Sequence, residues 1–112
     1  MQIQKNKAIF EELMGCCVVT CKRDSGVLVT LLGDEGRKLL QLDRNAKIDP
    51  LDFRDSSMEH IDRNRATFEA LAGFTIAGAE IIEGQLKVVF VKGEEPRGIA
   101  IDRDAKITLK RP

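Results

Sequence analysis

The chain has 112 residues, of which 43% are hydrophobic and 32% are charged. This composition is too apolar for an intrinsically disordered chain and too rich in charge for a membrane span. The 18 Lys and Arg residues balance the 18 Asp and Glu residues, so no net charge draws the protein to nucleic acid or to an anionic membrane. We expect a single domain over residues 1–112.

The first residues and the cysteines indicate a cellular location. Residues 1–7 are polar, and no apolar stretch follows their lysines, which does not fit a secretory signal. The three cysteines, Cys16, Cys17 and Cys21, are odd in number and crowded together, which does not fit a disulfide framework. We therefore expect reduced thiols and a cytoplasmic protein.

An internal repeat is the strongest pattern in the sequence. Residues 3–15 match residues 61–73, with Ile, Asn, Ala, Phe, Glu, Leu and Gly at corresponding positions. With one extra residue in a later loop, the match continues through residues 43–48 and 102–107. The sequence therefore predicts a tandem duplication with units 3–48 and 61–107, joined by a connection over residues 49–60.

Each unit is expected to begin with a short helix. Asn6 and Asn64 are candidate N-caps, and Gly15 and Gly73 are candidate glycines just past the helix ends. Apolar residues between these positions recur at helical spacing. An isolated helix of about nine residues is marginal in water, so each helix must pack on another element.

Strand-like segments follow each helix. Gly26 and Gly84 mark turns between the first two segments of each unit, where a positive φ costs little. We expect three strands per unit, over residues 16–22, 27–32 and 38–43 in the first and residues 74–81, 85–91 and 97–102 in the second. A short further strand is expected at residues 107–110.

These elements predict an α+β domain. Two αβββ units would share one core with pseudo-two-fold symmetry, because about 45 residues rarely stabilise themselves. The sheet would be mostly antiparallel, with the two short helices on one face, or it would close into a small barrel.

Basic residues are the candidates for anion binding. Some flank the proposed helix starts, where cations and backbone N–H groups favour a phosphate or carboxylate. Others belong to two matching Asp-Arg pairs, where an Arg fork can hold an anion or tie a turn together. These residues are Lys5, Lys7, Arg63, Arg65, Arg44 and Arg103. The alternative is that all of them are ordinary solvated charges.

Acidic residues that coincide in the two units are the candidates for catalysis. Glu11 and Glu69, or Asp43 and Asp102, would have to meet in a shared pocket to act as general acid and base. No residue is assigned a catalytic role from the sequence alone.

The cysteines and the single histidine, His60, have the ligand count of a structural zinc site. Their spacing lacks the C-x₂₋₄-C pairs that such sites show. Packing as small hydrophobic residues explains the cysteines better, so no metal and no cofactor are predicted.

The leading functional hypothesis is a small noncatalytic protein-binding or regulatory module that binds a protein partner or a second copy of itself. Leu51, Phe53 and Met58, apolar residues in the connection, are the interface candidates. One alternative is a binder of a small anion or of nucleic-acid phosphate at the basic helix starts, although nucleic acid is not favoured. A third is an enzyme that uses symmetric Asp, Glu and Arg groups. No membrane partner is expected.

Overall fold

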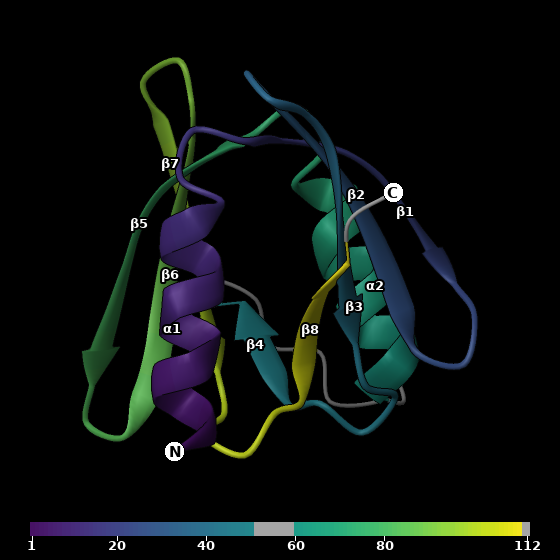
Figure 1. Cartoon of the computed structure of the whole chain (residues 1–112), viewed down its shortest axis with the longest axis vertical. Helices are drawn as coiled ribbons and strands as arrows, with labels where there is room; N and C mark the ends of the chain where they lie inside the picture. Colours follow the sequence, from purple (N-terminus) through teal and green to yellow (C-terminus); the bar gives the residue numbers. More distant parts are fainter. Residues whose placement is uncertain (51–59, 111–112) are drawn as a thin grey trace.

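The computed structural model describes residues 1–50 and 60–110 (Figure 1). These residues form an α+β fold with two helices, as expected, and with eight strands, one more than the seven expected. Helix α1 spans Gln2–Glu12 and precedes β1 (Cys17–Arg23), β2 (Val27–Gly33), β3 (Gly36–Leu42) and β4 (Ile48–Pro50). Helix α2 spans His60–Ala70 and precedes β5 (Thr75–Ile82), β6 (Gln85–Lys92), β7 (Glu95–Ile101) and β8 (Ile107–Lys110). We call residues 1–50 the first half and residues 60–110 the second half.

The eight strands form one antiparallel sheet in the order β4-β7-β6-β5-β1-β2-β3-β8. Its outermost strands are exchanged between the halves, since β4 pairs with β7 and β8 pairs with β3. The sheet is open, so the expectation that it might close into a barrel is wrong. Closure would need a ladder between β4 and β8, which have only three and four residues and share no paired residues in the described ranges.

The two halves of the sheet join at a short seam between β1 and β5. Cys17 and Thr75 face each other there, and four backbone hydrogen bonds of 2.8 to 3.0 Å connect residues 15–18 with residues 73–76. Beyond the seam the two strands diverge to opposite sides of the molecule (Figure 1). The seam therefore fixes the relative position of two three-stranded meanders.

Each helix packs on strands of the other half. Helix α1 contacts β5, β6 and β8, and α2 contacts β1, β2 and β4. Between them lies one continuous apolar core, in which the rings of Phe68 and Phe90 meet edge to face with centroids 6.4 Å apart. Phe10 of α1 is also fully buried. Because large aromatic side chains dominate core energetics, this arrangement makes the halves depend on each other.

The predicted N-caps are wrong. Helix α1 begins at Gln2 and α2 at His60, so Asn6 and Asn64 lie inside the helices, and neither has any exposed surface. The side-chain amide of Asn6 donates to the carbonyl of Ala105 at 2.8 Å, and that of Asn64 donates to Ala46 at 2.8 Å. Each asparagine thus ties a helix to a turn in the other half of the chain.

The predicted strands are confirmed to within two residues, but β4 was missed. The hairpins β1–β2 and β5–β6 each contain a β-bulge, between Val18 and Thr20 and between Ile76 and Gly78. Strand β4 escaped prediction because three residues are too few to show alternation. The interface candidates in the connection, which are Leu51, Phe53 and Met58, lie outside the described residues.

Candidate functional site

The basic residues predicted to flank the helix starts lie within the helices instead. Lys7 pairs with Glu11 at 3.0 Å, and Arg65 pairs with Glu69 at 3.2 Å, each one turn away on its own helix. Such exposed pairs contribute only about 0.3–0.5 kcal/mol. The two helices do not touch each other within the described ranges, so Glu11 and Glu69 form no carboxylate pair. Anion binding here stays a prediction that these contacts do not test.

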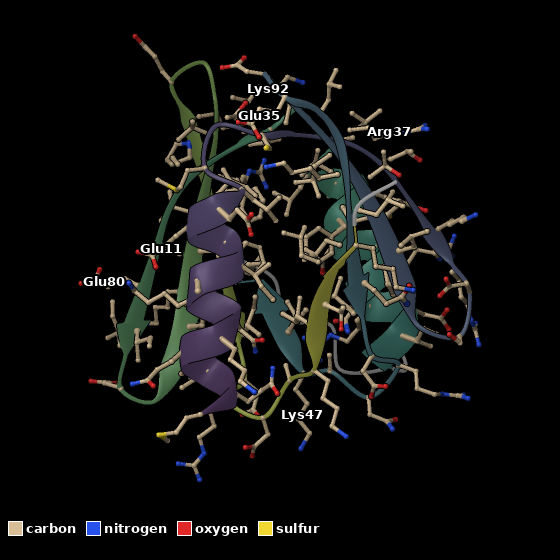
Figure 2. All side chains as sticks on the ribbon, viewed as in Figure 1. Glu11, Glu35, Arg37, Lys47, Glu80 and Lys92 are labelled. Carbon is tan, nitrogen blue, oxygen red and sulfur yellow. The ribbon has the colours of Figure 1, made fainter. Side chains whose placement is uncertain are left out.

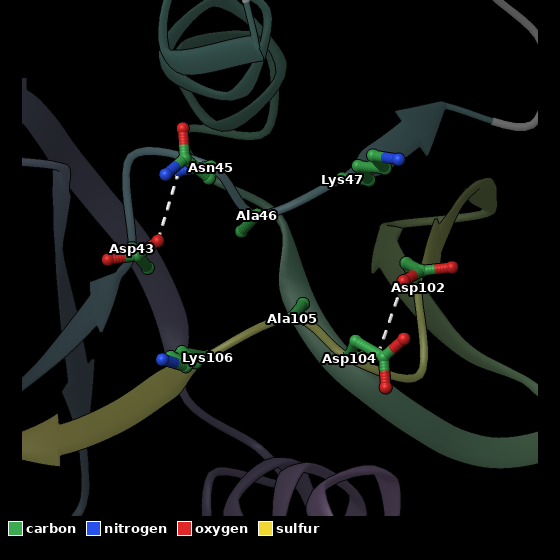
Figure 3. A pocket seen from close by; sticks show the side chains of 8 residues that line it. All are labelled: Asp43, Asn45, Ala46, Lys47, Asp102, Asp104, Ala105 and Lys106. Carbon is green, nitrogen blue, oxygen red and sulfur yellow. Dashed lines mark hydrogen bonds between the residues drawn. The ribbon is translucent and has the colours of Figure 1, made fainter.

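The two Asp-Arg segments form matching turns, residues 43–47 and 102–106. In each turn the Asp side chain accepts a hydrogen bond from the backbone N–H two residues later, 3.1 Å for Asp43 with Asn45 and 3.2 Å for Asp102 with Asp104 (Figure 3). The backbone N–H of each Asp donates to a lysine carbonyl of the other turn at 2.9 Å. The aspartates therefore order two turns that hold each other.

A hollow of about 290 Å³ lies between these two turns. Three carboxylates and two ammonium groups surround it, with the two alanines in the middle (Figure 3). Its lining residues are Asp43, Asn45, Ala46, Lys47, Asp102, Asp104, Ala105 and Lys106. Arg44 and Arg103 are exposed and do not belong to this lining.

The chemistry available in this hollow is limited. Asp43 and Asp102 do meet there, as the enzyme hypothesis requires, but the lining contains no hydroxyl, thiol or imidazole. One oxygen of each carboxylate is already engaged in its turn. Across the described residues, no group of three or more His, Cys, Asp and Glu side chains is placed to hold a metal ion. The hydrogen bonds that order the two turns and hold them together account for these aspartates.

The three cysteines are free thiols that do not converge. Cys16 is buried in the core, while Cys17 is half-buried on the opposite face of the sheet. The thiol of Cys21 donates to the carbonyl of Arg65 at 3.2 Å. Burial, with the nearby carboxylate of Glu69, raises the pKa of Cys21 to about 11. Cys21 is therefore protonated at neutral pH and is not a nucleophile.

The face of the sheet opposite the helices carries an uncharged band. Strand register aligns one row of residues across six strands, from β7 through the seam to β3. This row consists of Pro96, Val91, Thr75, Cys17, Leu32 and Arg37. Only its last member is charged. We call Val19, Leu32, Val89, Val91, Cys17 and Thr75 the outer band.

Three large apolar side chains of the outer band are open to solvent. Leu32 is 54% exposed, Val19 is 50% exposed and Val89 is 42% exposed. Val19 is the extra residue of the β1 bulge, and Val89 lies opposite Gly78, which has no side chain. The chain has 32% charged residues. Where one face of an antiparallel sheet meets solvent, the side chains on that face are usually polar or charged. Apolar exposure at the centre of the sheet therefore marks a candidate contact surface.

The outer band was not predicted from the sequence. A signal existed, because several strands have apolar residues at two neighbouring positions, as in Val18-Val19, Leu31-Leu32 and Val88-Val89. Such pairs place an apolar side chain on both faces of a strand. The sequence left open whether the sheet would close into a barrel or stay open with both helices on one face, so these pairs did not by themselves mark an uncovered surface.

Comparison with known proteins gives no match: no protein-family model, no curated protein and no solved structure is similar to this chain. No helix in the described ranges is long and apolar enough to cross a membrane.

Proposed function

We propose that this protein is a noncatalytic binding module that attaches to a protein partner through the outer band. The observation that carries the proposal is the exposure of Val19, Leu32 and Val89 around the seam. The centres of protein interfaces are depleted of charge and rich in apolar side chains. An apolar side chain that stays exposed on a strand contributes no hydrophobic free energy, whereas burying the same side chain in an interface does.

The position of the outer band supports this role. It lies on paired strands whose backbone groups are already hydrogen-bonded, so binding would order few additional groups. It also includes side chains from both halves, since Leu32 and Cys17 come from the first and Val89 and Thr75 from the second. A partner that covers the band would bridge the seam and stabilise the junction between the halves.

We also propose that the chain is a tandem duplication with pseudo-two-fold symmetry. Three matched features support this: the buried asparagine tethers, the bulges of β1 and β5, and the exchange of β4 and β8. The seam then lies on the symmetry axis, and the outer band surrounds it. Three free cysteines fit a protein of the reducing cytoplasm.

Site-specific photo-crosslinking tests the proposed surface. Benzoylphenylalanine placed at Leu32 or at Val89 in cells of the source organism should crosslink to the same partner protein. The same group at Arg103, an exposed residue of the turn at residues 102–106, should not. Equal crosslinking from all three positions, or none from the two band positions, would contradict the proposal.

Charge substitutions provide the second test. Val19→Asp together with Val89→Asp should weaken retention of the crosslinked partner by at least about tenfold, which corresponds to roughly 1.4 kcal/mol. Both residues are exposed, so the melting temperature should change little. The alternative function, anion binding at Lys5, Lys7 and the other basic candidates, predicts retention that falls steeply with salt. Binding through an uncharged band predicts retention that does not.

A further inference from the structure

The two halves differ sharply beside the seam, where Phe74 of the second half corresponds to Cys16 of the first. Phe74 is nearly buried, and two cations lie over its ring. The ammonium of Lys92 and the guanidinium of Arg97 are each 5.9 Å from the ring centroid. This is an aromatic ring held between the core and a cationic cover, an arrangement that cation–π attraction stabilises.

The corresponding place in the first half is a hollow. In the strand register, Cys16 stands for Phe74 and Gly33 stands for Lys92, because Cys17 pairs with Leu32 as Thr75 pairs with Val91. Both replacements are smaller. A hollow of about 400 Å³ results, which is within the range of roughly 300–1,000 Å³ that ligand pockets occupy. We call it the ring pocket. Its lining residues are Glu12, Met14, Gly15, Cys16, Gly33, Asp34, Glu35 and Lys38.

Glycine at position 33 maintains this space. A Cβ atom there would lie 2.6 Å from the sulfur of Cys16, closer than atoms in real structures approach. With glycine, Cys16 keeps its place in the core and the space above it stays open. The ring pocket is therefore a consequence of particular small residues and not of loose packing.

The ring pocket adjoins the outer band. Cys16 and Gly33 are the chain neighbours of the band residues Cys17 and Leu32. Figure 2 shows Glu35 at the same end of the molecule as Lys92, with Lys47 of the turn at residues 43–47 at the opposite end. Interfaces commonly combine a flat apolar surface with a pocket that accepts one anchoring side chain.

The charges of the ring pocket are opposite to those around Phe74. Its lining contains the carboxylates of Glu12, Asp34 and Glu35 against the single ammonium of Lys38. The ring of Phe74 is instead covered by two cations. An occupant with a positive charge beside its ring would meet complementary charge, which favours it over an anionic or neutral competitor.

From these observations we propose that the ring pocket receives an aromatic side chain of the protein partner, flanked by a basic residue. The ring would take the place that Phe74 occupies in the second half, and the basic residue would face Asp34 and Glu35. This inference rests on the proposed binding function and adds the chemistry of the segment that the partner inserts.

Short peptides test the ring pocket without the partner. The probes are acetylated dipeptide amides with the sequences Lys-Phe, Glu-Phe and Lys-Ala, titrated while the backbone amide shifts of Cys16, Gly33 and Lys38 are followed by NMR. Lys-Phe should give saturable shifts at these amides. Glu-Phe and Lys-Ala, which lack the cation and the ring respectively, should bind at least about tenfold more weakly, or roughly 1.4 kcal/mol. Equal binding of all three, or no saturation by Lys-Phe, would overturn the proposal.

Three variants make the test independent of folding. Cys16→Phe should fill the ring pocket with its own ring and abolish the Lys-Phe shifts, whereas Arg103→Ala, at an exposed position outside the outer band and the ring pocket, should leave them intact. If Cys16→Phe does not fold, Glu35→Lys on the exposed turn should reverse the preference from Lys-Phe to Glu-Phe. Crosslinking from the outer band without peptide binding would reject the ring pocket alone. Peptide binding without crosslinking would reject the protein-binding function and leave the pocket standing.

Discussion

At the scale of single residues, the two buried asparagines show how one residue type serves different purposes. The sequence placed Asn6 and Asn64 correctly at matching positions of two helices but assigned them to caps, because asparagine is favoured there. In the structure both carry hydrogen bonds to the opposite turns. They differ in their second polar atom. The oxygen of Asn6 accepts from Gln2 at 2.9 Å, whereas that of Asn64 has no donor among the described residues.

Asn64→Ala should lower the free energy of unfolding by about 1–3 kcal/mol, the usual cost of leaving a buried polar group without its partner. The group left unpaired would be the carbonyl of Ala46. The midpoint of urea unfolding measures this loss. Asn45→Ala, at an exposed position of the same turn, is the control and should change stability by less than about 0.5 kcal/mol. Equal midpoints for the two variants would refute the tether.

The thiol of Cys21 should make stability fall at high pH. Its pKa is raised from 9.0 to about 11, mainly by burial, so the folded chain holds this proton more tightly than the unfolded chain. The contribution of the Cys21 thiol to the free energy of unfolding is therefore complete below pH 9 and is lost as the pH rises towards 11. The stability of the wild type relative to Cys21→Ser, followed by urea unfolding across this range, should be constant and then decline. A constant difference up to pH 11 would show that the thiol is not perturbed.

At the scale of helices and strands, the sequence predicted local structure well and pairing between distant segments poorly. Alternation and turn glycines located both hairpins, since these depend on neighbouring residues. The exchange of β4 and β8 could not be predicted, because it depends on where the chain crosses after β3 and β7. The helix starts were also misplaced. Gln2 and His60 carry no cap signal, and tertiary contacts extend each helix towards the N-terminus.

Gly26 shows how a turn residue controls the packing of strands. It joins β1 to β2, and a Cβ atom at this position would collide with the carbonyl oxygen of Leu42 on β3. Gly26→Ala should therefore destabilise the fold by about 1–3 kcal/mol through overpacking, measured by thermal unfolding. Gly78 of β5 is the matched control, because an added Cβ there meets nothing within 4 Å. A Gly78→Ala variant as unstable as Gly26→Ala would mean that overpacking is not the cause.

At the scale of the whole molecule, the halves are interlocked and the candidate site emerges only from that arrangement. The outer band exists because β1 and β5 meet at the seam while both helices occupy the other face. The ring pocket exists because Cys16 and Phe74 occupy corresponding positions beside the same seam. The repeat made this comparison possible from the sequence, but the hollow requires the proximity of Gly33 to Cys16. Only the folded chain reveals it.

Because each half packs on strands of the other, the isolated halves should not fold alone. In a fragment of residues 1–54, α1 would lack β5 and β6, and β3 would lack β8. A fragment of residues 55–112 would lack the corresponding strands. Neither fragment should fold as a monomer, because each exposes the apolar face that the other covers.

Mixing the two fragments in equal amounts should restore the circular dichroism and NMR spectrum of the intact chain. Phe10→Asp in the first fragment should prevent this, because Phe10 is fully buried in the shared core. Independent folding of either fragment as a monomer would contradict the interlocked architecture. If the first fragment folds only as a homodimer, its own strands can replace those of the second half. That result would support the duplication, because an ancestral single unit would have exchanged the same strands between two identical chains.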